Sequence, residues 1–263
     1  MPFLNLPGWD MYYEEHGKGP RNIVAIHGNL ASTRWWRYLW PYVQQEYRVI
    51  AMDLRGCGQS SRVSEGYQIS QFAKDIDVLA QALQLEQFHL LGHSMGGQIA
   101  LAYTIAYPHK VQTLTLLDSI PAGGLDLSDE GRQVFGKLQQ DKEFLRQAIL
   151  SCVPYVENQD FVTELWEDAF GCAPEIYFRN PETMHETVLL GEAEKLTTPT
   201  LLLHGREDSI IPVAAMQETI RAMSRARVAF LENCGHSPFI EKPHTAAGIY
   251  FQFLEDHNCK EGK

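Results

Sequence analysis

The sequence contains a serine, an aspartate and a histidine that could act together as nucleophile, acid and base. Ser94 is the central residue of a Gly-x-Ser-x-Gly motif at positions 92–96, between a short apolar run and an alanine-rich segment of helical pattern. A serine on so sharp a strand-to-helix turn presents its hydroxyl outward, and the glycines avoid collisions with the neighbouring strand and helix. The motif predicts a nucleophilic serine, and the backbone NH of Met95 is expected to stabilise an oxyanion.

A serine hydroxyl is a weak nucleophile at neutral pH and needs an adjacent base. The chain has ten histidines, so their location decides among them. His236 lies just beyond the last predicted strand, after a glycine that lets the loop bend back toward Ser94. Three other histidines lie where local hydrogen bonding is expected, namely His27, His93 and His204. We therefore expect His236 to be the general base.

The acid that orients this histidine is expected in a loop at the carboxyl end of a strand. Asp208 follows the apolar run 200–204 and lies between the serine and the histidine along the chain. The chain order serine, acid, histidine favours Asp208. Its neighbour Glu207, and Asp118 at the end of an earlier predicted strand, are the alternatives.

These three residues must be positioned by the strands and helices around them. Short apolar runs occur at 48–52, 88–91, 111–117, 200–204 and 228–231. Longer segments of helical periodicity occur at 33–45, 70–83, 95–107, 213–223 and 242–257. Their alternation is typical of βα units and predicts an α/β protein with a mainly parallel sheet. Near the N-terminus, residues 9–15 and 22–26 flank a turn and are expected to form a hairpin that enters this sheet.

Strand signals stop between about residues 120 and 196. Amphipathic pieces of helical pattern replace them at 128–140, 141–152, 160–170 and 181–190. A long insertion without strands in a compact α/β domain usually has a function, often that of covering the site. We therefore expect a helical lid at 120–196, inserted after the strand that ends near Leu117, and a single core domain made of 1–119 and 197–263.

Apolar and aromatic side chains near the serine and in the insertion could line a substrate pocket. The candidates are Leu30, Trp35, Trp36, Phe135, Trp166 and Phe170. Aromatic residues on amphipathic helices pack in a core more often than they contact a ligand. If the lid covers the site, its lining indicates a small to medium, partly apolar substrate.

Composition and charge exclude several classes of protein. The formal net charge is −11 and the lysines and arginines form no run, which argues against nucleic acid and against anionic membrane surfaces. The five cysteines are odd in number and lack a Cys-x-x-Cys pair, so neither a disulfide framework nor a zinc site is expected. The sequence has no signal peptide pattern and no run of 18 apolar residues, which predicts a cytoplasmic protein. Its oligomeric state is expected to be a monomer or a homodimer.

Four motifs, in this order, resemble those of the α/β-hydrolase superfamily. They are Ile-His-Gly-Asn at 26–29, Asp-Leu-Arg-Gly-Cys-Gly-Gln-Ser at 53–60, the serine motif, and the pair formed by Gly-x-x-Asp at 205–208 and Gly-His at 235–236. The resemblance extends from near the N-terminus to about Leu254 and implies a mostly parallel, doubly wound sheet. It also implies that the backbone NH of Asn29 is the second oxyanion donor. Relatives such as haloalkane dehalogenases and epoxide hydrolases place aspartate where this chain has Ser94, which argues against both activities.

These features together predict a serine hydrolase that cleaves a carboxylic ester or lactone through an acyl-enzyme on Ser94, with no metal, nucleotide or organic cofactor. Thioester, amide and carbon–carbon bond hydrolysis and perhydrolysis use the same three residues and are the alternatives among enzymes. Relatives that cleave carbon–carbon bonds often carry a Gly-Asn-Ser motif, whereas this chain has His93 before the serine. A ligand receptor that retains the three residues is the alternative from another class.

Overall fold

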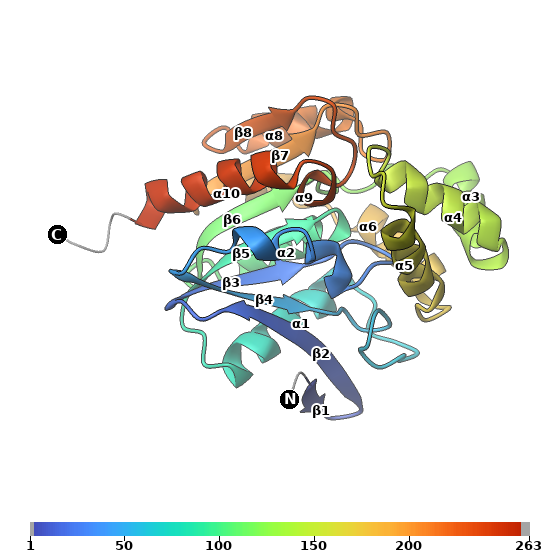
Figure 1. Cartoon of the computed structure of the whole chain (residues 1–263), viewed down its shortest axis with the longest axis horizontal. Helices are drawn as coiled ribbons and strands as arrows, with labels where there is room; N and C mark the ends of the chain where they lie inside the picture. Colours follow the sequence, from blue (N-terminus) through green and yellow to red (C-terminus); the bar gives the residue numbers. More distant parts are fainter. Residues whose placement is uncertain (1–2, 259–263) are drawn as a thin grey trace.

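The computed structural model describes residues 3–258, which form an α/β structure around one eight-stranded sheet (Figure 1). The strand order is β1-β2-β4-β3-β5-β6-β7-β8. Neighbouring strands from β4 to β8 are parallel, while β2 is antiparallel to both β4 and β1. The strands are β1 (Phe3–Leu6), β2 (Trp9–Gly17), β3 (Arg21–Ile26), β4 (Tyr47–Met52), β5 (Phe88–His93), β6 (Val111–Leu117), β7 (Thr200–Gly205) and β8 (Arg227–Leu231). The predicted mostly parallel sheet is confirmed.

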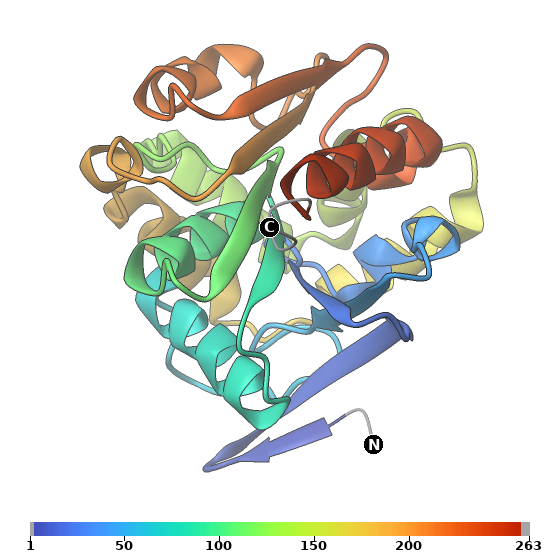
Figure 2. The ribbon, with the colours of Figure 1, turned by 90° about the vertical axis from the view of Figure 1, so that its left-hand side faces the viewer.

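The central strands are continuous apolar runs because both faces of the sheet are covered. In β3, Val24 and Ile26 belong to one buried core, and Ile23 and Ala25 belong to a second core on the opposite face. Helices α1 (Ile69–Ala82) and α2 (Met95–Ala106) pack together on the first face. Helices α9 (Pro238–Glu241) and α10 (Pro243–Asn258) cover the other face, and Figure 2 shows the sheet between these layers. The sheet is therefore doubly wound.

The predicted hairpin of residues 9–15 and 22–26 is wrong. Strand β2 forms its hairpin with β1, and its other neighbour is β4, which separates it from β3. Strand β3 lies in the interior of the sheet, where it pairs with β4 on one side and β5 on the other. This position agrees with the complete burial of residues 23–26. The more exposed β2 instead lies near the edge of the sheet.

The helix expected at residues 33–45 is also wrong, because the chain there forms two short 3₁₀ turns, Thr33–Trp36 and Trp40–Tyr42. Pro41 lacks a backbone NH and cannot continue a regular helix through this segment. The segment at 213–223 is divided into a 3₁₀ turn, Val213–Met216, and α8 (Gln217–Ala222). The helices expected from 70, 95 and 242 begin within one residue of those positions.

Five helices lie between β6 and β7, where the sequence predicted an insertion. They are α3 (Asp129–Gln140), α4 (Lys142–Cys152), α5 (Gln159–Phe170), α6 (Ile176–Glu186) and α7 (Leu190–Ala193). Helix α6 starts five residues before the predicted 181, since Pro181 is accommodated inside the helix. Helices α3, α4 and α5 lie beyond the carboxyl ends of the parallel strands, at the right of Figure 1. This edge of a parallel sheet is where ligands usually bind.

Two further expectations concern cysteines and membranes. Cys57, Cys152, Cys172 and Cys234 are free thiols, and Cys259 lies outside the described residues. No helix within residues 3–258 is both long and apolar enough to cross a bilayer.

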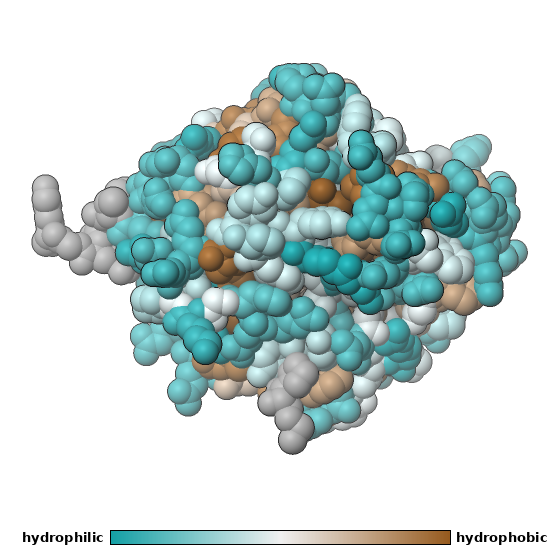
Figure 3. Space-filling model, in the orientation of Figure 1, coloured by the Kyte–Doolittle hydropathy of each residue, from teal (hydrophilic) through white to brown (hydrophobic). Residues whose placement is uncertain are grey.

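The face of the molecule in Figure 3 is mainly hydrophilic, with apolar residues in small separate patches.

Candidate active site

Ser94 occupies the sharp turn that joins β5 to α2. Its backbone is in an uncommon conformation (φ 54°, ψ −120°) and is held by a 2.9 Å hydrogen bond from its NH to the carbonyl of Leu117. A Cβ atom on Gly92 would lie 2.2 Å from the carbonyl oxygen of Gly96, and one on Gly96 would lie 2.3 Å from that of Ile26. Only glycine fits at both positions, and strain of this kind persists where the surrounding structure holds it.

Asp208 and His236 are hydrogen bonded. Asp208 lies in the loop after β7, and its Oδ2 accepts the Nδ1 hydrogen of His236 over 2.7 Å. Its Oδ1 accepts backbone NH groups from Ile210 (2.8 Å) and Ile211 (2.9 Å). Burial alone would raise the pKa of Asp208, but His236 and the backbone donors lower it to about 2. Asp208 is therefore a carboxylate that fixes the orientation of the His236 ring.

The loop that carries His236 is braced from two sides. Glu241 is partly buried, and its two carboxylate oxygens accept the backbone NH groups of Gly235 (3.0 Å) and Ser237 (2.9 Å), which flank His236. His93 donates from Nε2 to the carbonyl of His236 over 2.7 Å. Burial lowers the pKa of His93 to about 3, so His93 is neutral and serves as a fixed donor. The sequence suggested only a local hydrogen bond for His93.

Ser94 and His236 line the same cavity, whose volume is about 380 Å³. The wall is formed by the core on one side and by the insertion on the other. The apolar side chains that line it include Leu30, Trp35, Ile120, Leu125, Leu127, Val134, Phe135, Leu138, Phe144, Leu145, Ile149 and Met184. The cavity is apolar with a few convergent polar groups, a composition that is typical of small-molecule sites.

The two expected oxyanion donors lie beside the serine. Met95 is the first residue of α2, so its backbone NH has no acceptor within the helix. Asn29 lines the cavity. The preceding residue packs closely against Ser94, because a Cβ atom on Gly28 would lie 3.0 Å from Cβ of Ser94. Asn29 and Met95 therefore both lie near Ser94, where the sequence analysis expected the oxyanion donors.

Three of the six predicted pocket residues, Leu30, Trp35 and Phe135, line the cavity. The other three predicted residues do not line it. Trp36 is buried in the core beneath the opposite face of the sheet, near Phe239. Trp166 and Phe170 stack on each other on α5, and Phe170 is 42% exposed. Consecutive residues of a turn face different layers, and aromatic periodicity alone does not tell which face of a helix is covered.

Several residues of the site were not predicted from the sequence. Leu145 and Met184 line the cavity from α4 and α6, and the helical periodicity of the insertion was the available signal. Cys152 at the end of α4 also lines it, and its carbonyl accepts the hydroxyl of Ser237 over 2.8 Å. Glu241 follows His236 closely in sequence, but its role depends on the folding of the loop between them.

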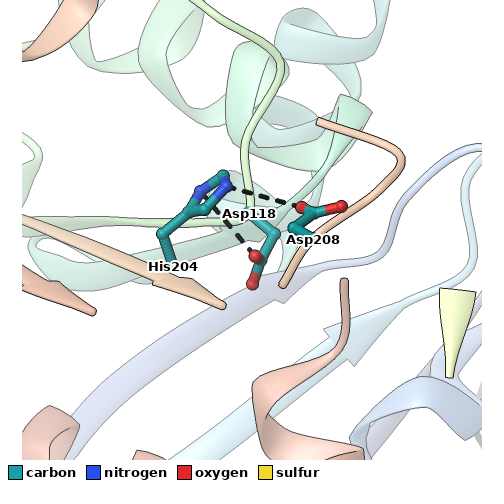
Figure 4. A group of neighbouring side chains, drawn as sticks. All are labelled: Asp118, His204 and Asp208. Carbon is teal, nitrogen blue, oxygen red and sulfur yellow. Dashed lines mark ion pairs between the residues drawn. The ribbon is translucent and has the colours of Figure 1, made fainter. Parts of the chain in front are cut away.

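Glu207 and Asp118, the two alternatives to Asp208, do not contact the His236 ring in the structure's hydrogen bonds. Glu207 accepts the NH of Cys234 over 3.0 Å and supports the same loop. Asp118 is fully buried. Its side chain lies next to His204 and Asp208 (Figure 4). The pairing of Asp208 with His236 distinguishes it from both rivals.

Asp118, His204 and Asp208 have the residue types of a metal site, and one ligand atom of each lies within 4.8 Å of the others. However, Nε2 of His204 is hydrogen bonded to the carbonyl of Ile211 at 2.8 Å, and Asp208 binds His236 and two backbone NH groups. These bonds already use most of the ligand atoms of the cluster.

A family model of the alpha/beta hydrolase fold matches residues 21–161, more than half of the chain. Together with the sheet and the serine turn, this match shows that the chain belongs to the α/β-hydrolase family.

Known relatives extend over nearly the whole chain and differ in activity. The monoacylglycerol lipase ABHD6 of Homo sapiens is 25% identical, over 92% of this chain and 78% of the lipase. The 2-hydroxy-6-oxo-6-(2'-aminophenyl)hexa-2,4-dienoic acid hydrolase of Metapseudomonas resinovorans is 25% identical, over 96% and 90%. The crystal structure of a bromoperoxidase from Bacillus anthracis superposes with a TM-score of 0.88 at 26% identity, over 94% and 96%.

Proposed function

We propose that this α/β hydrolase cleaves a carboxylic ester or lactone of small to medium size through an acyl-enzyme on Ser94. One observation carries the proposal. Ser94, on its strained turn, lines the same apolar cavity as His236, whose Nδ1 is bound to the Asp208 carboxylate at 2.7 Å. A nucleophile and a base that line one apolar cavity, with an acid hydrogen bonded behind the base, are the parts that acyl transfer requires.

In the first half of the proposed reaction, His236 removes the proton of Ser94 as its oxygen attacks the substrate carbonyl. Asp208 holds the imidazole in the required tautomer and stabilises the positive charge that forms on it. The NH groups of Asn29 and Met95 donate to the tetrahedral oxyanion. Collapse of this intermediate expels the alcohol, which takes the proton from His236, and leaves the acyl group on Ser94.

In the second half, a water molecule attacks the acyl carbonyl while His236 accepts its proton. The carboxylic acid leaves, and the proton returns from His236 to Ser94. For a lactone, the alcohol and the acid are parts of one product. The cycle consumes one water molecule and regenerates the enzyme.

The cavity favours a neutral, partly apolar substrate. None of the residues that line it is lysine or arginine, and Asp126 adds an acidic group. A substrate carboxylate would therefore have no cationic partner there, and an unpaired charge in an apolar site costs several kcal/mol, on the order of a hundredfold or more in affinity. This argues for an ester over a dienoic acid such as the one named for the Metapseudomonas relative.

We further propose that the insertion is a lid that limits substrate size. Leu138 on α3 and Leu145 on α4 are buried and line the same cavity as Ser94. The lid is attached to the core by Arg34, whose guanidinium binds Asp168 and Glu164 of α5, each at 2.7 Å.

The test is hydrolysis of p-nitrophenyl esters from acetate to octanoate and of simple lactones by wild type, Ser94→Ala and the exposed control Ser224→Ala. We expect wild type and the control to be equally active and Ser94→Ala to lose about a thousandfold or more. An initial burst of p-nitrophenol and a mass increase on Ser94 would identify the acyl-enzyme. Equal activity of wild type and Ser94→Ala would overturn the proposal.

A fluorophosphonate probe gives an independent readout, because it forms a covalent bond with an activated serine. Labelling of wild type, but not of Ser94→Ala, is expected. Labelling without hydrolysis of any ester or lactone would retain the activated serine but exclude the proposed substrate class.

A further inference from the structure

A second carboxyl group lies beside the Asp208 carboxylate. Asp118 directly follows β6, the parallel neighbour of β7, and its residue is 0% exposed. One of its oxygens lies within 4.8 Å of an Asp208 oxygen and of a His204 ring nitrogen, and all three side chains converge in Figure 4. Its backbone has φ 41°, which is unusual for a residue other than glycine, and its NH bonds to the carbonyl of Leu203. The fold holds this carboxyl in place despite that strain.

In a buried site, two carboxyl groups this close resist being ionised together, because the negative charge of one disfavours that of the other. Asp208 receives three hydrogen bonds, from His236, Ile210 and Ile211. Asp118 receives one, from the NH of Gly205 to its Oδ1 over 2.9 Å. The negative charge therefore belongs to Asp208, and Asp118 carries a proton. Burial and the neighbouring Asp208 raise the pKa of Asp118 well above its ordinary value, in agreement with this assignment.

The proton on Asp118 needs an acceptor, and Oδ2 of Asp118 has no hydrogen-bond partner in the structure. The facing titratable groups are His204 and Asp208 from β7 and its loop, and Glu241 from α9. His204 bonds through Nε2 to the carbonyl of Ile211, and its Nδ1 is 3.7 Å from Oδ1 of Asp118, too far for a hydrogen bond. Oδ2 of Asp208, which accepts from His236, retains a second lone pair.

We propose that Asp118 is a neutral carboxylic acid that donates a hydrogen bond to the Asp208 carboxylate and thereby positions it. The role in catalysis rests on the proposed function, whereas the protonation state of Asp118 does not. This bond disperses part of the charge on Asp208, so Asp208 stabilises the protonated form of His236 less strongly. Asp118 is thus a positioning residue that affects the pH at which the base becomes active.

The principal variant is Asp118→Asn, which preserves shape, a donor toward Asp208 and an acceptor for Gly205. If Asp118 is neutral, the acid limb of the kcat/KM profile should stay within about 0.3 pH units of wild type and kcat within about threefold. If Asp118 is instead ionised, loss of its charge should move the acid limb to lower pH by about 1 unit and reduce kcat. That shift would overturn the proposal.

Asp118→Ala removes the donor altogether. The acid limb should then move to higher pH by about half a unit or more, because Asp208 loses one of its stabilising hydrogen bonds. A loss of stability alone would lower the amount of active enzyme without moving this limb. An Asp118→Ala profile that coincides with the wild-type profile would contradict the positioning role.

Infrared difference spectroscopy tests the protonation state without any substrate. Wild type at neutral pH should show the C=O band of a protonated carboxylic acid, shifted in D₂O and missing from Asp118→Asn. Absence of this band from wild type would refute the neutral form. If Asp118→Asn fails to fold, Asp118→Ala replaces it as the reference in which the band should be missing. Lack of ester hydrolysis with the band present would refute the proposed function but retain the assignment of the proton.

Discussion

Asn180 on α6 donates a hydrogen bond from Nδ2 to Oδ1 of Asn29 over 2.7 Å, and so connects the insertion with the segment beside Ser94. Asn180 is 1% exposed, whereas Asn29 borders the cavity. Since the backbone NH of Asn29 is a proposed oxyanion donor, a residue of the insertion helps to set the geometry of the catalytic core.

Asn180→Ala should therefore lower kcat for the preferred ester by about tenfold, with a smaller change in KM, because an oxyanion donor acts mainly in the transition state. Steady-state kinetics of the variant test this expectation. The control is Arg179→Ala, one position earlier on α6 and exposed, which should match wild type. A rise in KM at unchanged kcat would show that the contact serves substrate binding instead.

The cavity wall should set the preferred chain length of the substrate. Phe135→Ala should raise the kcat/KM ratio of octanoate to butyrate ester about tenfold, since the space gained holds about two methylenes at about 0.8 kcal/mol each. The matched control is Phe178→Ala, at a position 47% exposed on the insertion, which should leave the ratio unchanged. Identical chain-length profiles for Phe135→Ala and wild type would mean that the acyl chain binds elsewhere.

Glu241 should be needed to hold the loop of His236, the proposed general base. In Glu241→Gln, an NH₂ group replaces one carboxylate oxygen and faces a backbone NH of Gly235 or Ser237. We expect kcat to fall about tenfold, since one unsatisfied buried group costs about 1–3 kcal/mol. Glu232→Gln, whose side chain is 67% exposed, is the control. Unchanged kcat in Glu241→Gln would show that the loop keeps its conformation without this carboxylate.

A buried histidine far from the reaction should make stability depend on pH. His89 in β5 is bonded to Thr113, and burial lowers its pKa to about 4. Below pH 6.5 the unfolded chain binds a proton at His89, but the folded protein does not bind one until about pH 4. The free energy of unfolding therefore falls at this site as the pH decreases from 6.5 to about 4.

Relative to His89→Gln, wild type should lose about 2 kcal/mol of unfolding free energy between pH 7.5 and pH 5. Urea unfolding of both proteins at the two pH values measures this difference. A gap between the two proteins that does not change with pH would show that His89 is not held in its neutral form.

The sequence by itself determined the local chemistry of this protein. The glycines around Ser94 require a sharp turn, and Asp208 and His236 each follow a predicted strand. Because parallel strands end at the same edge of a sheet, the alternation of strands and helices was enough to bring the three into one region. The resemblance to the α/β-hydrolase superfamily also implied a doubly wound sheet, and in the structure β3 to β7 have few exposed positions because both faces are covered.

Only the tertiary structure decided which distant surfaces meet. Strand β2 lies beside β4 although β3 follows it in sequence, and Trp36 faces the opposite core from Trp35. The bracing of His236 by Glu241, and the placement of Asp118 next to Asp208, likewise depend on loops that come together in the fold. Periodicity defines which face of an element is apolar, but hydrophobic burial is non-directional, so the partner of that face is chosen by the packing of the whole chain.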